Sequence, residues 1–202
     1  MKSPQIAVSH TTSIPEDVFA DFVHIVSAEK LDLQMESREE DGPFAALEWL
    51  IPTAVVVYIS KSYFDGFLKE MGMDHYALLK AGLKTLHGKL IGPLVPKATV
   101  ISTHGKAKGE HIYSLRYSIL AEAGEGLRFK LLIRSEVSSD EYDEVLASFL
   151  TFLAAYHGGT LDGTSVEQLA QARVVGTTML LTFNSESKAI EPVDPIPRKA
   201  ER

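Results

Sequence analysis

The sequence predicts an α/β protein, and three observations support this fold class. The first half of the chain alternates apolar, β-branched segments with segments of helical period, which is the order expected of a parallel sheet with helical crossovers. The second half contains strand-like segments joined by glycine-containing loops, a pattern typical of an antiparallel meander. The chain has 202 residues, of which 45% are hydrophobic, so one domain can bury a core without disulfides or metals.

Three strands are predicted in the first half, and each has a different pattern. Residues 5–9 form a short apolar strand, whereas residues 31–36 alternate apolar and polar side chains, as a half-buried strand near a sheet edge does. Residues 53–60 are almost continuously apolar and β-branched, which indicates a central strand covered on both faces. With three intervening helices, these segments predict a parallel β-α-β-α-β-α half over residues 1–93.

The helices of this half are predicted from caps and apolar spacing. Ser13 and Glu16 have the spacing of a capping box and begin the first helix. Residues 44–51 form two helical turns, which a proline ends because the residue before proline is forced out of the α region. Ser62 caps the third helix, which carries a long apolar stripe that faces the core.

The second half, residues 97–184, is predicted to be antiparallel with additional helices. Strands are expected at residues 98–103, 111–121 and 127–135, because loops containing glycine separate three apolar segments there. A last strand is expected at residues 177–183. The sheet should therefore continue beyond the parallel part.

Two further capping boxes predict the helices of the second half. Ser138 with Glu141 begins a long helix, and Thr164 with Glu167 begins a short one. The end of the chain contains three prolines and many charged residues, which predicts a flexible tail over residues 185–202. A single domain should then cover the preceding part of the chain.

Composition excludes several classes of function. The chain has no cysteine, which rules out disulfides, thiolate zinc sites and cysteine nucleophiles. It has 27 acidic and 20 basic residues, a net charge of -7, which disfavours contacts with a phosphate backbone. No signal-peptide core is evident, and the longest apolar stretch is shorter than the roughly 20 residues of a membrane span. We therefore expect a cytoplasmic protein that binds neither nucleic acid nor membranes.

Residues 1–90 resemble a Toll/interleukin-receptor (TIR) domain in three places. The segment 6–10 is similar to the first strand of that family, which ends in a Ser-His-type pair. Gly42 and Pro43 follow the second predicted strand, where the family has a loop with Gly or Pro. The segment 54–64 is similar to the third strand of the family and to the Ser-x-x-Tyr start of its helix.

The resemblance implies a doubly wound, three-layer sheet of TIR or flavodoxin type that assembles through contacts between domains. In some members of the family it also implies cleavage of NAD by a glutamate on a helix. Gly72 occupies the place of that glutamate here, and Glu70 is the nearest carboxylate. The fold of the family is therefore implied more directly than its catalytic residue.

Four residues of the first half are candidates for a site. Glu70 is the candidate catalytic carboxylate, because glycosidic cleavage needs a carboxylate near an oxocarbenium-like ribose; its alternative interpretation is an exposed helix residue. Ser9, His10 and Ser60 are candidate ligand-binding residues, because parallel strands would bring them to one edge of the sheet. The alternative for His10 is a solvated loop histidine.

A second candidate ligand-binding segment is the loop 104–111. Lys106 and Lys108, with the glycine N–H groups around them, form a pattern that can hold a phosphate, although a simple hairpin connection explains the same residues. His104 and His111 flank the loop without a third ligand nearby, so no metal is expected.

Three hypotheses about function follow. The first is a TIR-like signalling or defence module without catalysis or cofactor, which contacts a protein partner or forms a homo-oligomer. The second is an enzyme that hydrolyses NAD or another nucleotide, with NAD as substrate, in a cleft at the carboxyl ends of the parallel strands. The third is a sensor of a phosphorylated small ligand. The sequence favours the first and leaves catalysis open.

Overall fold

The computed structural model describes residues 3–39, 53–71, 73–91 and 112–194. These residues form one mixed sheet of eight strands with helices packed against it, which confirms the α/β class. The strand order is β2-β1-β3-β4-β5-β7-β6, and β8 pairs with β7. The strands are β1 (Ile6–Thr11), β2 (Leu33–Arg38), β3 (Val55–Ile59), β4 (Tyr117–Gly124), β5 (Leu127–Leu131), β6 (Val174–Val175), β7 (Thr178–Asn184) and β8 (Ala189–Pro192).

The directions of the strands differ from the expected parallel first half. β1 and β2 are parallel and so are β3 and β4, but β1 and β3 run antiparallel. The prediction of three parallel strands is therefore wrong at the β1–β3 pair. An apolar, β-branched segment packs well beside a neighbour of either direction, so the pattern of residues 53–60 indicated a central strand without indicating its direction.

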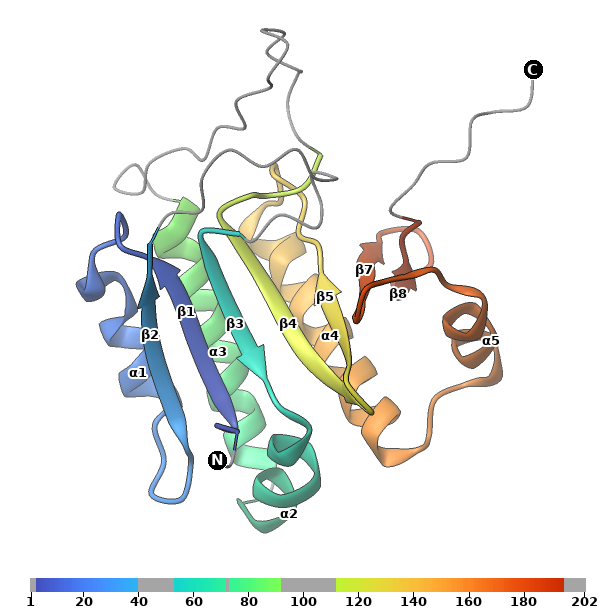
Figure 1. Cartoon of the computed structure of the whole chain (residues 1–202), viewed down its shortest axis with the longest axis horizontal. Helices are drawn as coiled ribbons and strands as arrows, with labels where there is room; N and C mark the ends of the chain where they lie inside the picture. The colour runs from blue at the N-terminus through green and yellow to red at the C-terminus, as the bar shows by residue number, and fades with distance from the viewer. Residues whose placement is uncertain (1–2, 40–52, 72, 92–111, 195–202) are drawn as a thin grey trace, which may run out of the picture.

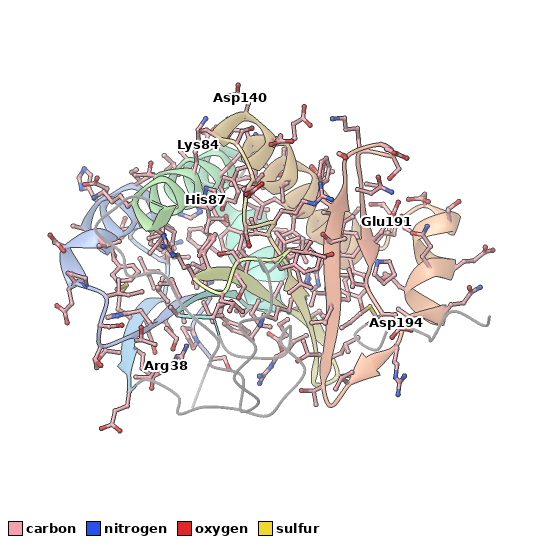
Figure 2. All side chains as sticks on the ribbon, turned by 90° about the horizontal axis from the view of Figure 1, so that it is seen from above. Arg38, Lys84, His87, Asp140, Glu191 and Asp194 are labelled. Carbon is pink, nitrogen blue, oxygen red and sulfur yellow. The ribbon has the colours of Figure 1, made fainter. Side chains whose placement is uncertain are left out.

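The described helices that pack on the sheet lie on one face of it (Figure 1, Figure 2). Contacts of α1 with α3 and of α3 with α4 make this layer continuous. Among the described residues the architecture thus has two layers, and the three-layer arrangement implied by the TIR resemblance is wrong for this part of the chain. The helices are η1 (Glu16–Phe19), α1 (Ala20–Val26), η3 (Tyr63–Phe67), α2 (Leu68–Met71), α3 (Met73–Ile91), α4 (Ser139–Gly158) and α5 (Gly163–Gln171).

The core lies between the sheet and this helical layer. Alternate residues of the central strands face the helices, and the strand register places them side by side, as in the neighbours Val8, Val57 and Ile119. Large buried side chains on the helices cover them. The close approach of α1 to α3 depends on Gly82, because a Cβ atom there would lie 2.5 Å from the Val26 side chain.

Only one of the three predicted capping boxes forms. Ser138 accepts the N–H of Glu141, and the Glu141 side chain accepts the N–H of Ser138, so this box is confirmed. The box at Ser13 is wrong, because the first helix begins after Pro15 without a side-chain cap. The box at Thr164 is also wrong, because Asp162 caps α5 by accepting the N–H of Ser165 at 2.9 Å.

The end of the described chain is more ordered than predicted. Residues 185–188 form a turn and lead into β8, which pairs with β7 and buries Ile190 in the core. The predicted start of the tail at residue 185 is therefore wrong, because one apolar side chain packs despite a polar, proline-containing surrounding. The predicted helix 44–51, strand 98–103 and loop 104–111 lie outside the described residues.

Candidate functional site

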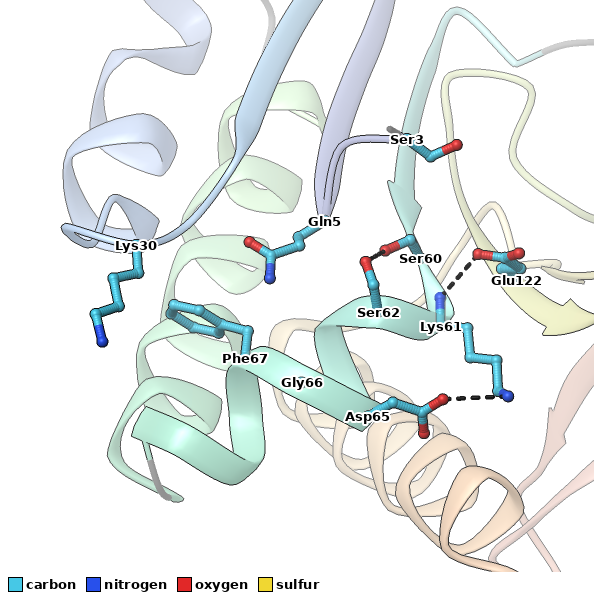
Figure 3. A pocket seen from close by; sticks show the side chains of 10 residues that line it. All are labelled: Ser3, Gln5, Lys30, Ser60, Lys61, Ser62, Asp65, Gly66, Phe67 and Glu122. Atoms are coloured by element: carbon cyan, nitrogen blue, oxygen red, sulfur yellow. Dashed lines mark hydrogen bonds and ion pairs between the residues drawn. The ribbon is translucent and has the colours of Figure 1, made fainter. Parts of the chain in front are cut away.

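A polar pocket of about 660 Å³ lies at the end of β3, where the chain enters η3 (Figure 3). β3 and β4 are parallel, so their carboxyl ends reach the same edge of the sheet, and antiparallel β1 begins there. Ligands of α/β proteins often bind outside the carboxyl ends of strands. We call this site the β3-end pocket. Its lining residues are Ser3, Gln5, Lys30, Ser60, Lys61, Ser62, Asp65, Gly66, Phe67 and Glu122.

Glu122, near the end of β4, is the most firmly held acidic residue of the pocket. Its Oε2 accepts the Tyr58 hydroxyl at 3.2 Å and the backbone N–H of Lys61 at 3.0 Å. Burial raises the pKa of Tyr58, and the charge of Glu122 raises it further, so the phenol stays protonated and donates. Both contacts use Oε2, and Oε1 makes no hydrogen bond to a described residue.

The opposite wall of the pocket comes from the start of the segment after β3. The Lys61 ammonium pairs with the Asp65 carboxylate at 3.1 Å, one helical turn later. The hydroxyl groups of Ser60 and Ser62 lie 2.6 Å apart and share a hydrogen bond. Ser60 is buried, and its backbone N–H donates to the carbonyl of Gln5. Strand β1 and the end of β3 are thereby joined at the floor of the pocket.

The helix at this wall has an unusual form. Tyr63–Phe67 is a π-helical segment that leads into α2. Short π-helical segments are rare and often occur at functional sites. Three consecutive residues of this segment, Asp65, Gly66 and Phe67, line the pocket. Tyr63, Phe64 and Phe67 also pack into the core, which anchors the segment.

His157, on the last turn of α4, packs against the π-helical segment that forms one wall of the pocket. Its ring stacks on Phe64 with ring centroids 4.9 Å apart, and its Nε2 is buried without a partner among the described residues. Burial lowers the pKa of His157, while the carboxylates of Asp65 and Glu122 oppose this shift. Both pocket carboxylates therefore act on the His157 ring, although the described lining of the pocket does not include it.

The structure separates the residues that the sequence placed in one cleft. Ser60 lines the β3-end pocket, but Ser9 and His10 pair with Val56 and Val55 at the other end of β3. The predicted grouping of these residues is wrong, because it assumed that β1 and β3 were parallel. His10 is 3% exposed, and its ring packs on Phe19 at 4.5 Å, so it is a core residue and the loop interpretation is also wrong.

The other predicted site residues are not tested by the described side chains. Glu70 lies on α2, and its side chain is outside the described part of the structure. Lys106 and Lys108 also lie outside it. Sequence reasoning missed Glu122 as a site residue. The available signal was a single acidic residue at the end of an apolar strand, which is equally typical of a turn.

Among the described residues that line the β3-end pocket, the charges balance. Lys30 and Lys61 contribute two positive charges, and Asp65 and Glu122 contribute two negative charges. No cluster of three or more potential metal ligands occurs among the described residues. In the same part of the chain, no helix combines the length and the apolar character that crossing a membrane requires.

Comparisons with models of protein families, with curated proteins and with solved structures find no match to this chain.

Proposed function

We propose that the β3-end pocket binds a small ligand rich in hydroxyl groups, such as the ribosyl part of a nucleotide. The observation that supports this proposal is the geometry of Glu122. Tyr58 and the Lys61 backbone hold one carboxylate oxygen, and the other has no described partner. Carboxylates at strand ends accept hydrogen bonds from ribose hydroxyls in dinucleotide sites, and Ser60 and Ser62 add further polar groups.

The balance of charge favours an uncharged sugar over a phosphate as the group held in this pocket. Lys61 is already paired with Asp65, and binding a phosphate strongly requires cations or N–H groups that are not neutralised. Hydroxyl groups, in contrast, donate to carboxylates and accept from ammonium groups within one lining. The mixed lining of the pocket suits them.

Isothermal titration calorimetry with adenosine, ADP-ribose and NAD tests the proposal. We expect saturable binding of at least one of them, and Glu122→Gln should weaken it at least tenfold, which corresponds to about 1.4 kcal/mol. Glu167→Gln, on an exposed face of α5, is the matched control and should bind as the unaltered protein does. If none of the three ligands binds, or if both variants bind equally, the proposal is wrong.

Hydrolysis of NAD is a second candidate, because two carboxylates line the same pocket. Glu122 or Asp65 would stabilise the positive charge that develops on the ribose as the bond to nicotinamide breaks. Release of nicotinamide from NAD measures this activity directly. Comparing Glu122→Gln, Asp65→Asn and Glu70→Ala then identifies the carboxylate. Binding without any release would remove the catalytic candidate and leave the binding proposal intact.

Assembly with a protein partner or a second copy is the non-catalytic alternative. The edge strand β2 favours it, because β2 pairs only with β1 among the described residues and exposes Met35 at 39%. Open strand edges are sites at which further strands can add. Size-exclusion chromatography with light scattering tests self-association, which Met35→Lys should weaken. A monomer at all concentrations would contradict the homo-oligomer.

A further inference from the structure

A second, much smaller cavity lies at the opposite end of β4 from the β3-end pocket. Its volume is about 20 Å³, which is enough for roughly one water molecule or one oxygen atom of a ligand. It lies between the end of α3, the residues that precede β4 and the residues that follow β5. We call it the α3-end cavity. The polar residues that line it include His87, Ser114, Arg116, Arg134 and Ser135.

His87 is a buried polar residue without a described hydrogen-bond partner at this cavity. Its side chain is 5% exposed, and its ring lies parallel to the Tyr142 ring at a centroid distance of 3.6 Å. Burial lowers its pKa to about 4, so the imidazole is neutral at pH 7. Its ring nitrogens make no hydrogen bond to a described residue. Neither ring nitrogen is among the fully buried side-chain atoms that lack a partner in the described part of the chain, so the ring keeps polar surface that an occupant of the cavity could contact.

The charges around this cavity do not balance. Arg116 and Arg134 line it, and none of the other described lining residues is a carboxylate. Arg116 is held in place, because its Nη1 donates to the Leu90 carbonyl at 3.2 Å. Hydrogen bonds from Ser138, and to a smaller extent the charge of Arg134, lower the pKa of the Glu141 carboxyl. This carboxylate is already engaged in its capping box, where it accepts the Ser138 N–H.

We propose that the α3-end cavity binds one anionic oxygen, supplied by a carboxylate or a phosphate group, between the two arginines and the ring of His87. The volume admits one such atom, so the remainder of the ligand would lie outside the mouth. Arginine suits this role because its planar N–H groups match carboxylate and phosphate oxygens. The proposal is independent of the β3-end pocket, whose charges cancel.

Thermal unfolding of the full chain with acetate, phosphate or chloride tests the proposal, with sodium HEPES keeping the ionic strength constant. A bound anion stabilises the native state in proportion to the logarithm of its concentration above Kd. We expect a saturable rise in Tm with acetate or phosphate that exceeds the rise with chloride. The oxyanion that gives the larger rise in Tm identifies the group that the cavity accepts.

Variants of exposed arginines make the test specific. Arg134 is exposed, so Arg134→Ala should fold, and it should raise the Kd for the anion at least tenfold. Arg173→Ala, at an exposed position after α5, should leave the Kd unchanged. No saturable stabilisation by either oxyanion, or an equal response of both variants, would overturn the proposal.

Nuclear magnetic resonance of the histidine rings gives a second readout. Acetate or phosphate should shift the ring nitrogens of His87 and leave those of His24, which is exposed on α1, unchanged. Equal shifts of both rings, or no shift of either, would contradict a specific site.

Discussion

The carboxylate of Glu122 accepts the backbone N–H of Lys61 at 3.0 Å, across 61 positions of sequence. This hydrogen bond joins the end of β4 to the second residue after β3, and the Tyr58 hydroxyl reinforces it from β3 itself. The two walls of the β3-end pocket are thus connected through one side chain. Five predictions follow from this contact and from other local features of the fold.

Replacing Glu122 should cost stability according to how much of its acceptor capacity is lost. Glu122→Ala leaves the Lys61 N–H and the Tyr58 hydroxyl without their acceptor, so the free energy of unfolding should fall by about 1–3 kcal/mol. Glu122→Gln keeps one acceptor oxygen and should cost less. Urea denaturation measures both, with Glu167→Ala as the control. Equal stability of the two Glu122 variants would contradict this role of the hydrogen bonds.

Two glycines of α3 should respond to alanine in opposite directions. At Gly82 a Cβ atom would lie 2.5 Å from the Val26 side chain and 3.2 Å from that of Phe22, so Gly82→Ala should destabilise by about 1–3 kcal/mol. At Gly88 no described atom lies within 4 Å, and Gly88→Ala should stabilise by about 0.5–1 kcal/mol through reduced backbone entropy of the unfolded chain. Thermal denaturation of the pair checks the prediction, and a shift of both variants in one direction would refute it.

Removing the side chain of Ser138, the N-cap of α4, should lower stability more than removing that of Ser139 beside it. Ser138→Ala removes the acceptor of the Glu141 N–H and should lower the free energy of unfolding by about 1 kcal/mol. Ser139→Ala, at the first helical position, is the control and should have a smaller effect. Chemical denaturation compares them. Equal losses would mean that the capping box does not contribute to stability.

The cap of α5 provides a qualitative companion test. Asp162→Ala should destabilise more than Thr164→Ala, because Asp162 accepts the N–H and the hydroxyl of Ser165. A larger loss of stability from Thr164→Ala than from Asp162→Ala would instead support the capping box that the sequence predicted at Thr164.

Stability should fall on acidification because of His87. The unfolded chain takes up a proton on this histidine near pH 6.5, while burial holds the native pKa at about 4. Between these values the unfolded state binds more protons, so stability rises with pH and is lost as pH falls from 6.5 to 4, by up to about 3 kcal/mol. Below about pH 4 the native histidine is protonated too, and its contribution to the loss ends.

A variant without the titrating ring separates this effect from that of the carboxylates. His87→Phe retains a ring that can pack against Tyr142, so the difference in unfolding free energy between the two proteins should change over this pH window. Urea denaturation at pH 7 and pH 4.5 measures it, with His24→Phe as the exposed control. A constant difference between the unaltered protein and His87→Phe would contradict the prediction.

Features that depend on neighbouring residues were predicted well from the sequence. A central strand within residues 53–60, observed at Val55–Ile59, the antiparallel pairing of β4 with β5 and the capping box at Ser138 are all confirmed. The two incorrect boxes show the limit of such patterns. Ser13 and Thr164 have the required spacing, but Asp162 competes for the start of α5, and Pro15 shifts the start of the first helix.

The candidate site was predicted only in part, because it depends on strand direction. Ser60 was identified from its place at the end of a central strand, and it lines the pocket. Ser9 and His10 were grouped with it on the assumption of a parallel sheet, and the antiparallel β1–β3 pair moves them to the other end. Local side-chain pattern does not specify strand direction, which depends on the path of the connecting chain.

The sequence by itself determined the α/β class, the central strand and the absence of cysteine chemistry, because each follows from composition or from residues a few positions apart. Only the tertiary structure decided which polar residues meet. Glu122 reaches Lys61, and His87 stacks on Tyr142, over long stretches of intervening chain. The physical reason is that a sheet brings distant segments into register through its pairing, and each single segment is compatible with more than one neighbour.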